Sequence, residues 1–113
     1  MIDWAHVAGL CADFGEEEFA EVVALFMAEV QDGLARLAMA DTPDAHRLAF
    51  HFLKGAALNL GFLDMAALTS AGEENATRGT DFRQEKEQVL ALFPPACTQF
   101  EREWREKTDA IRQ

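Results

Sequence analysis

The chain has 113 residues, half of them apolar, and its twenty acidic and ten basic side chains give a formal net charge of −10. This length suits one domain with a single core, so residues 1–113 are treated as one unit. The acidity disfavours nucleic-acid binding, which needs a basic surface to displace counterions. No apolar run approaches the ~20 residues of a membrane span, and the early residues lack the pattern of a signal peptide. We therefore expect a cytoplasmic protein that does not enter a membrane.

Two helices are predicted in the first third of the chain. A short amphipathic helix is capped by Asp3 and ends near Gly15. A longer helix then opens with the acidic run 16–18, which suits the positive end of the helix dipole. Its apolar side chains recur with a period of ~3.6 residues and are Phe19, Val22, Val23, Phe26, Val30, Leu34 and Leu37. This helix should stop before Thr42, which can cap a third helix that has Pro43 in its first turn.

The rest of the chain also reads as helix, with one interruption. The third helix is expected to end near Gly61, and a fourth to run from about 64 to 77. A last apolar period continues from Phe82 to Trp104, but Pro94-Pro95 interrupts it, which predicts a sharp kink or two separate helices. No alternating strand pattern occurs. The prediction is an all-α fold: an antiparallel four-helix bundle with an additional short N-terminal helix packed on one end.

The third helix carries a histidine on the face opposite its core stripe. Because an α-helix turns about 100° per residue, His51 shares one stripe with Lys54, Gly55, Leu58 and Phe62. The opposite, apolar stripe consists of Ala49, Leu53, Ala56, Ala57 and Leu60. The histidine is therefore expected in solvent, beside a lysine and next to a glycine that leaves room for something large to approach.

This stripe suits phosphoryl acceptance. A neutral imidazole is a nucleophile, and an unperturbed histidine titrates near pH ~6.5. A phosphoryl group on His51 would need a cation nearby, and Lys54 lies at i+3, about 5–6 Å away between Cβ atoms. The alternative for a bare His-x-x-Lys pair is a solvated helix face with no special role.

Residues 51–61, HFLKGAALNLG, resemble the signature of the histidine-containing phosphotransfer (HPt) domains of multistep His-Asp phosphorelays. The matching residues are His51, Leu53, Lys54, Gly55, Ala56, Ala57 and Gly61. The resemblance implies that His51 accepts the phosphoryl group, that Lys54 compensates the phosphate charge, and that Gly55 admits a receiver domain. The chain departs from the family pattern at Ala56 and Ala57, where the family often has serine. It also departs at Phe50, where a small residue is usual, and at Gly72, where leucine is common.

The resemblance also implies the partners. Response-regulator receiver domains or a hybrid histidine kinase would dock over His51, and a receiver would bring its own Mg²⁺. The apolar side chains around the acceptor, Phe52, Leu58 and Phe62, are expected to form part of the docking patch. The alternative for Phe62 is that the helix ends at Gly61 and the side chain turns inward. We expect the carrier itself to be a monomer without a cofactor.

No sequence feature supports a kinase or a metalloprotein. Gly55 and Gly61 lie in one predicted helix with no preceding strand, so they form no nucleotide-binding loop. The two cysteines match no metal-ligand spacing. The predicted function is therefore a phosphorelay carrier, not a conventional enzyme, that takes a phosphoryl group from a receiver aspartyl phosphate and passes it to another receiver. The alternative is a non-catalytic helical module that binds and inhibits a receiver or a histidine kinase.

Overall fold

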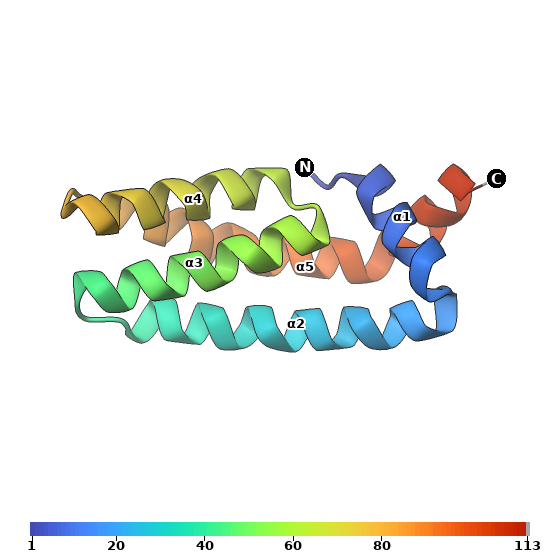
Figure 1. Ribbon diagram of the computed structural model, residues 1–113, viewed down its shortest axis with the longest axis horizontal. Helices are drawn as coiled ribbons and strands as arrows, with labels where there is room; N and C mark the ends of the chain where they lie inside the picture. Colours follow the sequence, from blue (N-terminus) through green and yellow to red (C-terminus); the bar gives the residue numbers. More distant parts are fainter. Residues whose placement is uncertain (113) are drawn as a thin grey trace.

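The computed structural model describes residues 1–112 as a bundle of helices. The elements are α1 (Trp4–Phe14), α2 (Glu16–Met39), α3 (Pro43–Leu60), α4 (Leu63–Arg78) and α5 (Arg83–Arg112). The four long helices α2 to α5 lie side by side and α1 crosses one end of them, within an elongated molecule of 47 × 21 × 20 Å (Figure 1). The predicted antiparallel four-helix bundle with an extra short N-terminal helix is confirmed. Within the described residues, no helix combines the length and the apolar character that crossing a membrane requires.

The ends of the third helix, α3, lie where the sequence predicted them. The Thr42 hydroxyl accepts a hydrogen bond of 3.0 Å from the backbone N–H of Ala45, and Pro43 is the first helical residue. At the other end Gly61 adopts the left-handed conformation with φ 73°, which an L side chain rarely does, and its N–H bonds back to the last turn. Both ends of α3, the helix that carries His51, are therefore defined by its own capping residues.

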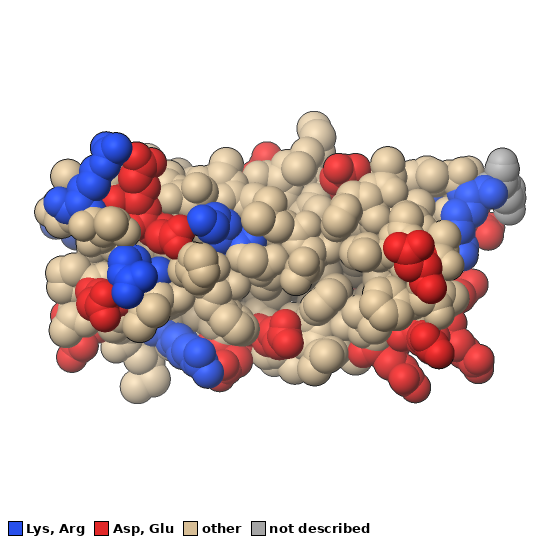
Figure 2. Space-filling model, in the orientation of Figure 1, with Lys and Arg blue, Asp and Glu red and all other residues tan. Residues whose placement is uncertain are grey.

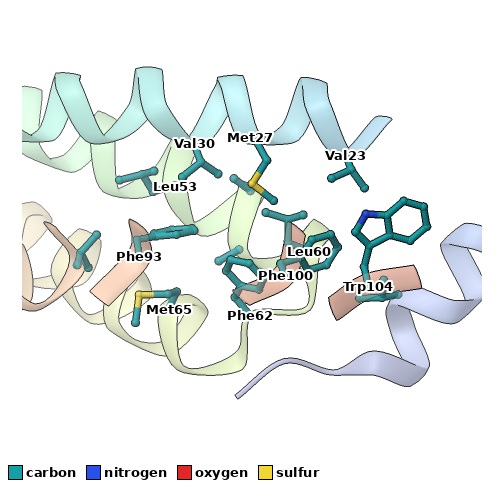
Figure 3. Close-up of a cluster of buried hydrophobic side chains, with 14 of the residues drawn as sticks. Val23, Met27, Val30, Leu53, Leu60, Phe62, Met65, Phe93, Phe100 and Trp104 are labelled. Atoms are coloured by element: carbon teal, nitrogen blue, oxygen red, sulfur yellow. The ribbon is translucent and has the colours of Figure 1, made fainter. Parts of the chain in front are cut away.

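α3 packs between α2 and α4, and α5 closes the bundle against the same two helices. The predicted core stripe of α3, which is Ala49, Leu53, Ala56, Ala57 and Leu60, is buried along its whole length. Figure 3 shows how side chains from four helices and from the α3–α4 connection fill the centre of the molecule. The stripe carrying His51 consequently faces away from the bundle.

Phe62 belongs to the core, so its predicted place on an exposed docking patch is wrong. Only 2% of the residue is accessible, and its ring lies 5.6 Å from that of Phe93 and 5.7 Å from that of Phe100 (Figure 3). The left-handed turn at Gly61 ends the helical phase and directs the next side chain inward. An isolated antiparallel bridge between Ile2 and Phe62, which the sequence did not predict, holds this connection against the N-terminal segment.

The last helix continues through Pro94-Pro95, so the alternative of two separate helices is wrong. Its buried side chains, Val89, Phe93, Phe100 and Trp104, recur on one face before and after the prolines. Burying that face outweighs the backbone hydrogen bonds that two prolines remove. A kink at this place stays a prediction.

Two of the departures from the family pattern, Phe50 and Gly72, compensate each other. Phe50 is fully buried on the side of α3 that faces α4. A Cβ atom added to Gly72 would lie 2.5, 2.6 and 2.7 Å from three atoms of the Phe50 ring. The large side chain on α3 therefore needs the missing side chain on α4, and these two residues set how closely the helices approach.

Both cysteines are unpaired packing residues. Cys11 is buried and Cys97 is partly buried. Burial, with a smaller contribution from the nearby Glu101 carboxylate, raises the pKa of the Cys97 thiol to about 12. The thiol is therefore protonated and unreactive at neutral pH.

Candidate functional site

The outward stripe of α3 presents a histidine, a glycine and a leucine to solvent. The His51 side chain is 68% exposed, Leu58 is 57% exposed, and Gly55 is exposed between them. A Cβ atom added to Gly55 would meet nothing within 4 Å, so the space over this residue is open. The exposure predicted for these three residues is confirmed.

A carboxylate from α4 joins the two predicted site residues. His51 Nδ1 lies 2.6 Å from Glu73 Oε2, and Lys54 Nζ donates to Glu73 Oε1 at 2.6 Å. The Glu73 side chain is only 18% exposed, whereas His51 projects beyond it into solvent. No role was predicted for Glu73 from the sequence, so this part of the site was missed.

The Glu73 carboxylate is ionised and fixes the protonation of the histidine ring. The Lys54 ammonium that donates to it lowers the pKa of the Glu73 carboxyl, the bond with His51 adds to that effect, and burial opposes it. An ionised carboxylate only accepts hydrogen bonds, so His51 Nδ1 must carry the proton that is shared with Glu73. In neutral imidazole this leaves the Nε2 lone pair free, on the exposed side of the ring.

The α3–α4 hairpin explains why these residues meet. In two antiparallel helices, residues equally distant from the connection lie at the same level, and His51 and Glu73 are equally distant from Phe62. The close approach of Phe50 and Gly72, each the preceding residue, brings the two helices together at this level. The hairpin symmetry about Phe62 is the signal from which Glu73 could have been found.

Lys54 and Phe52 are less exposed to solvent than the sequence suggested. Lys54 is only 28% exposed, because its ammonium turns toward Glu73. Phe52 is half-buried beneath the side chain of Arg36, whose guanidinium carbon lies 5.6 Å from the ring centre. The Phe52 ring is therefore only partly available beside His51, because it also packs between α2 and α3.

The histidine nearest to His51 in the sequence has a structural place. His46 is buried at the start of α3, where its Nδ1 contacts the Thr42 carbonyl at 2.6 Å and its Nε2 contacts Lys86 Nζ at 2.8 Å. Its ring packs against Phe82, with 4.5 Å between the ring centres. His46 is therefore a hydrogen-bonded histidine at the boundary of the core, and it is not exposed to a partner.

The fold and the site together define a carrier built on a helical bundle, with one histidine nitrogen free in solvent and a cation beside it. The family model of the Hpt domain matches residues 21–113, and the chain belongs to this family. The match begins inside α2 and covers α3 to α5, and α1 precedes it. Neither the comparison with curated proteins nor the comparison with solved structures found a match. Membership of the Hpt family places the chain in histidine phosphotransfer within phosphorelays, where response-regulator receivers are the partners.

Proposed function

We propose that His51 accepts a phosphoryl group from the aspartyl phosphate of a receiver domain and passes it to a second receiver. The observation that supports this most directly is the orientation of the ring. Its Nδ1 is held by Glu73 at 2.6 Å, while the side chain as a whole is 68% exposed. A nucleophile needs a free lone pair and an approach path, and Nε2 of His51 has both.

In the proposed step, the Nε2 lone pair attacks the phosphorus atom in line with the bond to the aspartyl oxygen. The N–P bond forms as the O–P bond breaks, and the receiver recovers its free carboxylate. The imidazole ring, which keeps its Nδ1 proton, becomes positively charged, and Glu73 faces that charge directly. Transfer to the second receiver reverses these changes, and the Glu73 bond holds the ring in one orientation throughout.

Two neighbours of His51 complete the proposal. Lys54 supplies the cation that compensates the phosphate charge, and its long side chain lets the ammonium leave Glu73 for a phosphate oxygen. Gly55, over which the space is open, admits the surface of the receiver. The receiver supplies its own Mg²⁺, so the carrier contributes position and charge compensation, as expected for phosphoryl transfer.

The test is labelling by a ³²P-phosphorylated receiver. Wild-type protein should acquire phosphate that is labile in acid and stable in base, as expected of a phosphoramidate. His51→Gln should acquire none and keep its helicity and melting temperature, because the side chain is exposed. His6→Gln is the matched control and should be labelled normally. Label remaining in His51→Gln would refute the assignment, and binding without label in the wild type would instead indicate the non-catalytic module.

A further inference from the structure

A hollow lies directly beside His51, between α2 and α3. Its volume is about 290 Å³, and it is lined by Glu29 from α2 and by His51, Phe52, Gly55, Ala56 and Asn59 from α3. It opens on the face that carries the exposed stripe of α3. In the view of Figure 2, which has α3 between α2 and α4, the middle of this face is mostly uncharged and charged side chains gather toward its two ends.

Glu29 is the carboxylate of this hollow, and it differs from the other acidic residues near the acceptor. Those have partners within the chain: Asp32 with Arg36, Asp44 with Arg47, and Glu73 with Lys54 and His51. The Glu29 side chain forms no hydrogen bond or ion pair with any residue in the described range 1–112. Glu29 is partly buried, and its charge is therefore uncompensated within the free protein.

Docking over His51 cannot leave Glu29 in water. A standard protein interface covers about 800 Å² on each partner, and Glu29 lines the same hollow as the acceptor ring. A receiver that brings its aspartyl phosphate to Nε2 consequently covers this carboxylate as well. A desolvated carboxylate without a partner is costly, so the receiver must place a complementary group against it.

The lining of the hollow indicates what kind of group fits. Phe52 and Ala56 offer apolar surface, whereas the Glu29 carboxylate and the Asn59 amide offer polar atoms. Lysine and arginine combine an apolar stem with a cationic end, which matches the apolar and polar parts of this lining. We infer that the hollow receives a basic side chain of the docking receiver, with the stem against Phe52 and Ala56 and the cation against Glu29. This inference rests on the proposed function of His51, and it adds the chemistry by which the partner is recognised.

The experiment compares charge changes at Glu29 with the same changes at Glu106, an exposed glutamate of α5 that has no partner within residues 1–112. The probe is the receiver domain, among those encoded in the same genome, that labels the wild-type protein fastest. Glu29→Gln should weaken its binding about threefold and Glu29→Lys about tenfold or more, since a rim charge contributes modestly and its reversal adds repulsion. Glu106→Gln and Glu106→Lys should leave the affinity unchanged.

The salt dependence of binding distinguishes a cationic partner of Glu29 from a neutral hydrogen-bond donor. The labelling of His51 distinguishes a failure of this inference from a failure of the proposed function. The Kd of the wild type should rise with salt more steeply than the Kd of Glu29→Gln, because one ion pair is missing in the variant. Equal salt dependence, or Glu29→Lys binding as tightly as Glu106→Lys, would overturn the inference while labelling of His51 stands. If no receiver labels the wild type, the proposed function fails and this inference fails with it.

Discussion

Gly72→Leu, which introduces the residue common in the family at this position, should separate α3 from α4 at the level of the acceptor. A Cβ at position 72 would already lie 2.5 to 2.7 Å from the Phe50 ring, closer than packed atoms come. The ring is fully buried. Overpacking costs about 1–3 kcal/mol, and leucine recovers about 1 kcal/mol over glycine in helix propensity. For a side chain as large as leucine we expect a net loss of about 2 kcal/mol.

The partner substitution tests whether the two positions act together. Phe50→Ala alone should cost about 3–5 kcal/mol, because it leaves a cavity between the helices. In the double variant Phe50→Ala/Gly72→Leu the leucine fills that cavity, which restores the family pattern. The loss should therefore be smaller than the sum of the single losses by more than ~1 kcal/mol, as expected for residues in contact.

Urea denaturation followed by circular dichroism measures all three free energies of unfolding. The control is Gly9→Ala, since a Cβ at Gly9 meets nothing within 4 Å and alanine should stabilise α1 by up to ~1 kcal/mol. The separation of the helices should also show at the site, as a weaker His51–Glu73 hydrogen bond in imidazole ¹⁵N spectra of Gly72→Leu. Additivity of the two substitutions within ~0.5 kcal/mol would refute this reasoning.

Two further predictions concern the outward stripe of α3. Gly55→Ala should stabilise the free protein by ~1 kcal/mol, whereas Gly55→Gln should weaken receiver binding, and unchanged binding of the glutamine variant in a titration would remove Gly55 from the contact surface. Leu58→Ala should lower receiver affinity several-fold with almost no change in melting temperature, whereas Phe62→Ala should cost about 3–5 kcal/mol of stability. The reverse pattern in thermal melts and titrations would show that the exposures of these two side chains are assigned the wrong way round.

The sequence predicted α3 accurately because local signals define it. Thr42 and Pro43 set its start, Gly61 sets its end, and the apolar period between them decides which face is buried. The exposure of His51 followed from that period alone. Phe62 was placed wrongly because the helical period was extended past Gly61, where a left-handed residue ends it.

The remaining differences depend on contacts between helices. Pro94-Pro95 carry a strong local signal for a break, but the buried face of α5 continues across them, and only the packed bundle shows that burial prevails. Glu73 was missed for the same reason, since its role exists only once α3 and α4 are paired in one register. In that register Phe50 packs on Gly72, a contact that the apolar pattern of a single helix does not contain.

The way in which α3 is anchored accounts for a reactive residue that is both exposed and well positioned. Near its start, the His46 ring on α3 contacts Lys86 of α5 at 2.8 Å, and at its end the Asp3 N–H donates to the Gly61 carbonyl at 2.7 Å. Between these anchors one whole face of the helix is buried, while the acceptor on the other face is held by Glu73 alone. The backbone of α3 at His51 is therefore held in place by packing, while Nε2 stays open to solvent. The proposed transfer through His51 between two receivers would need this combination, because each receiver would close the site from outside.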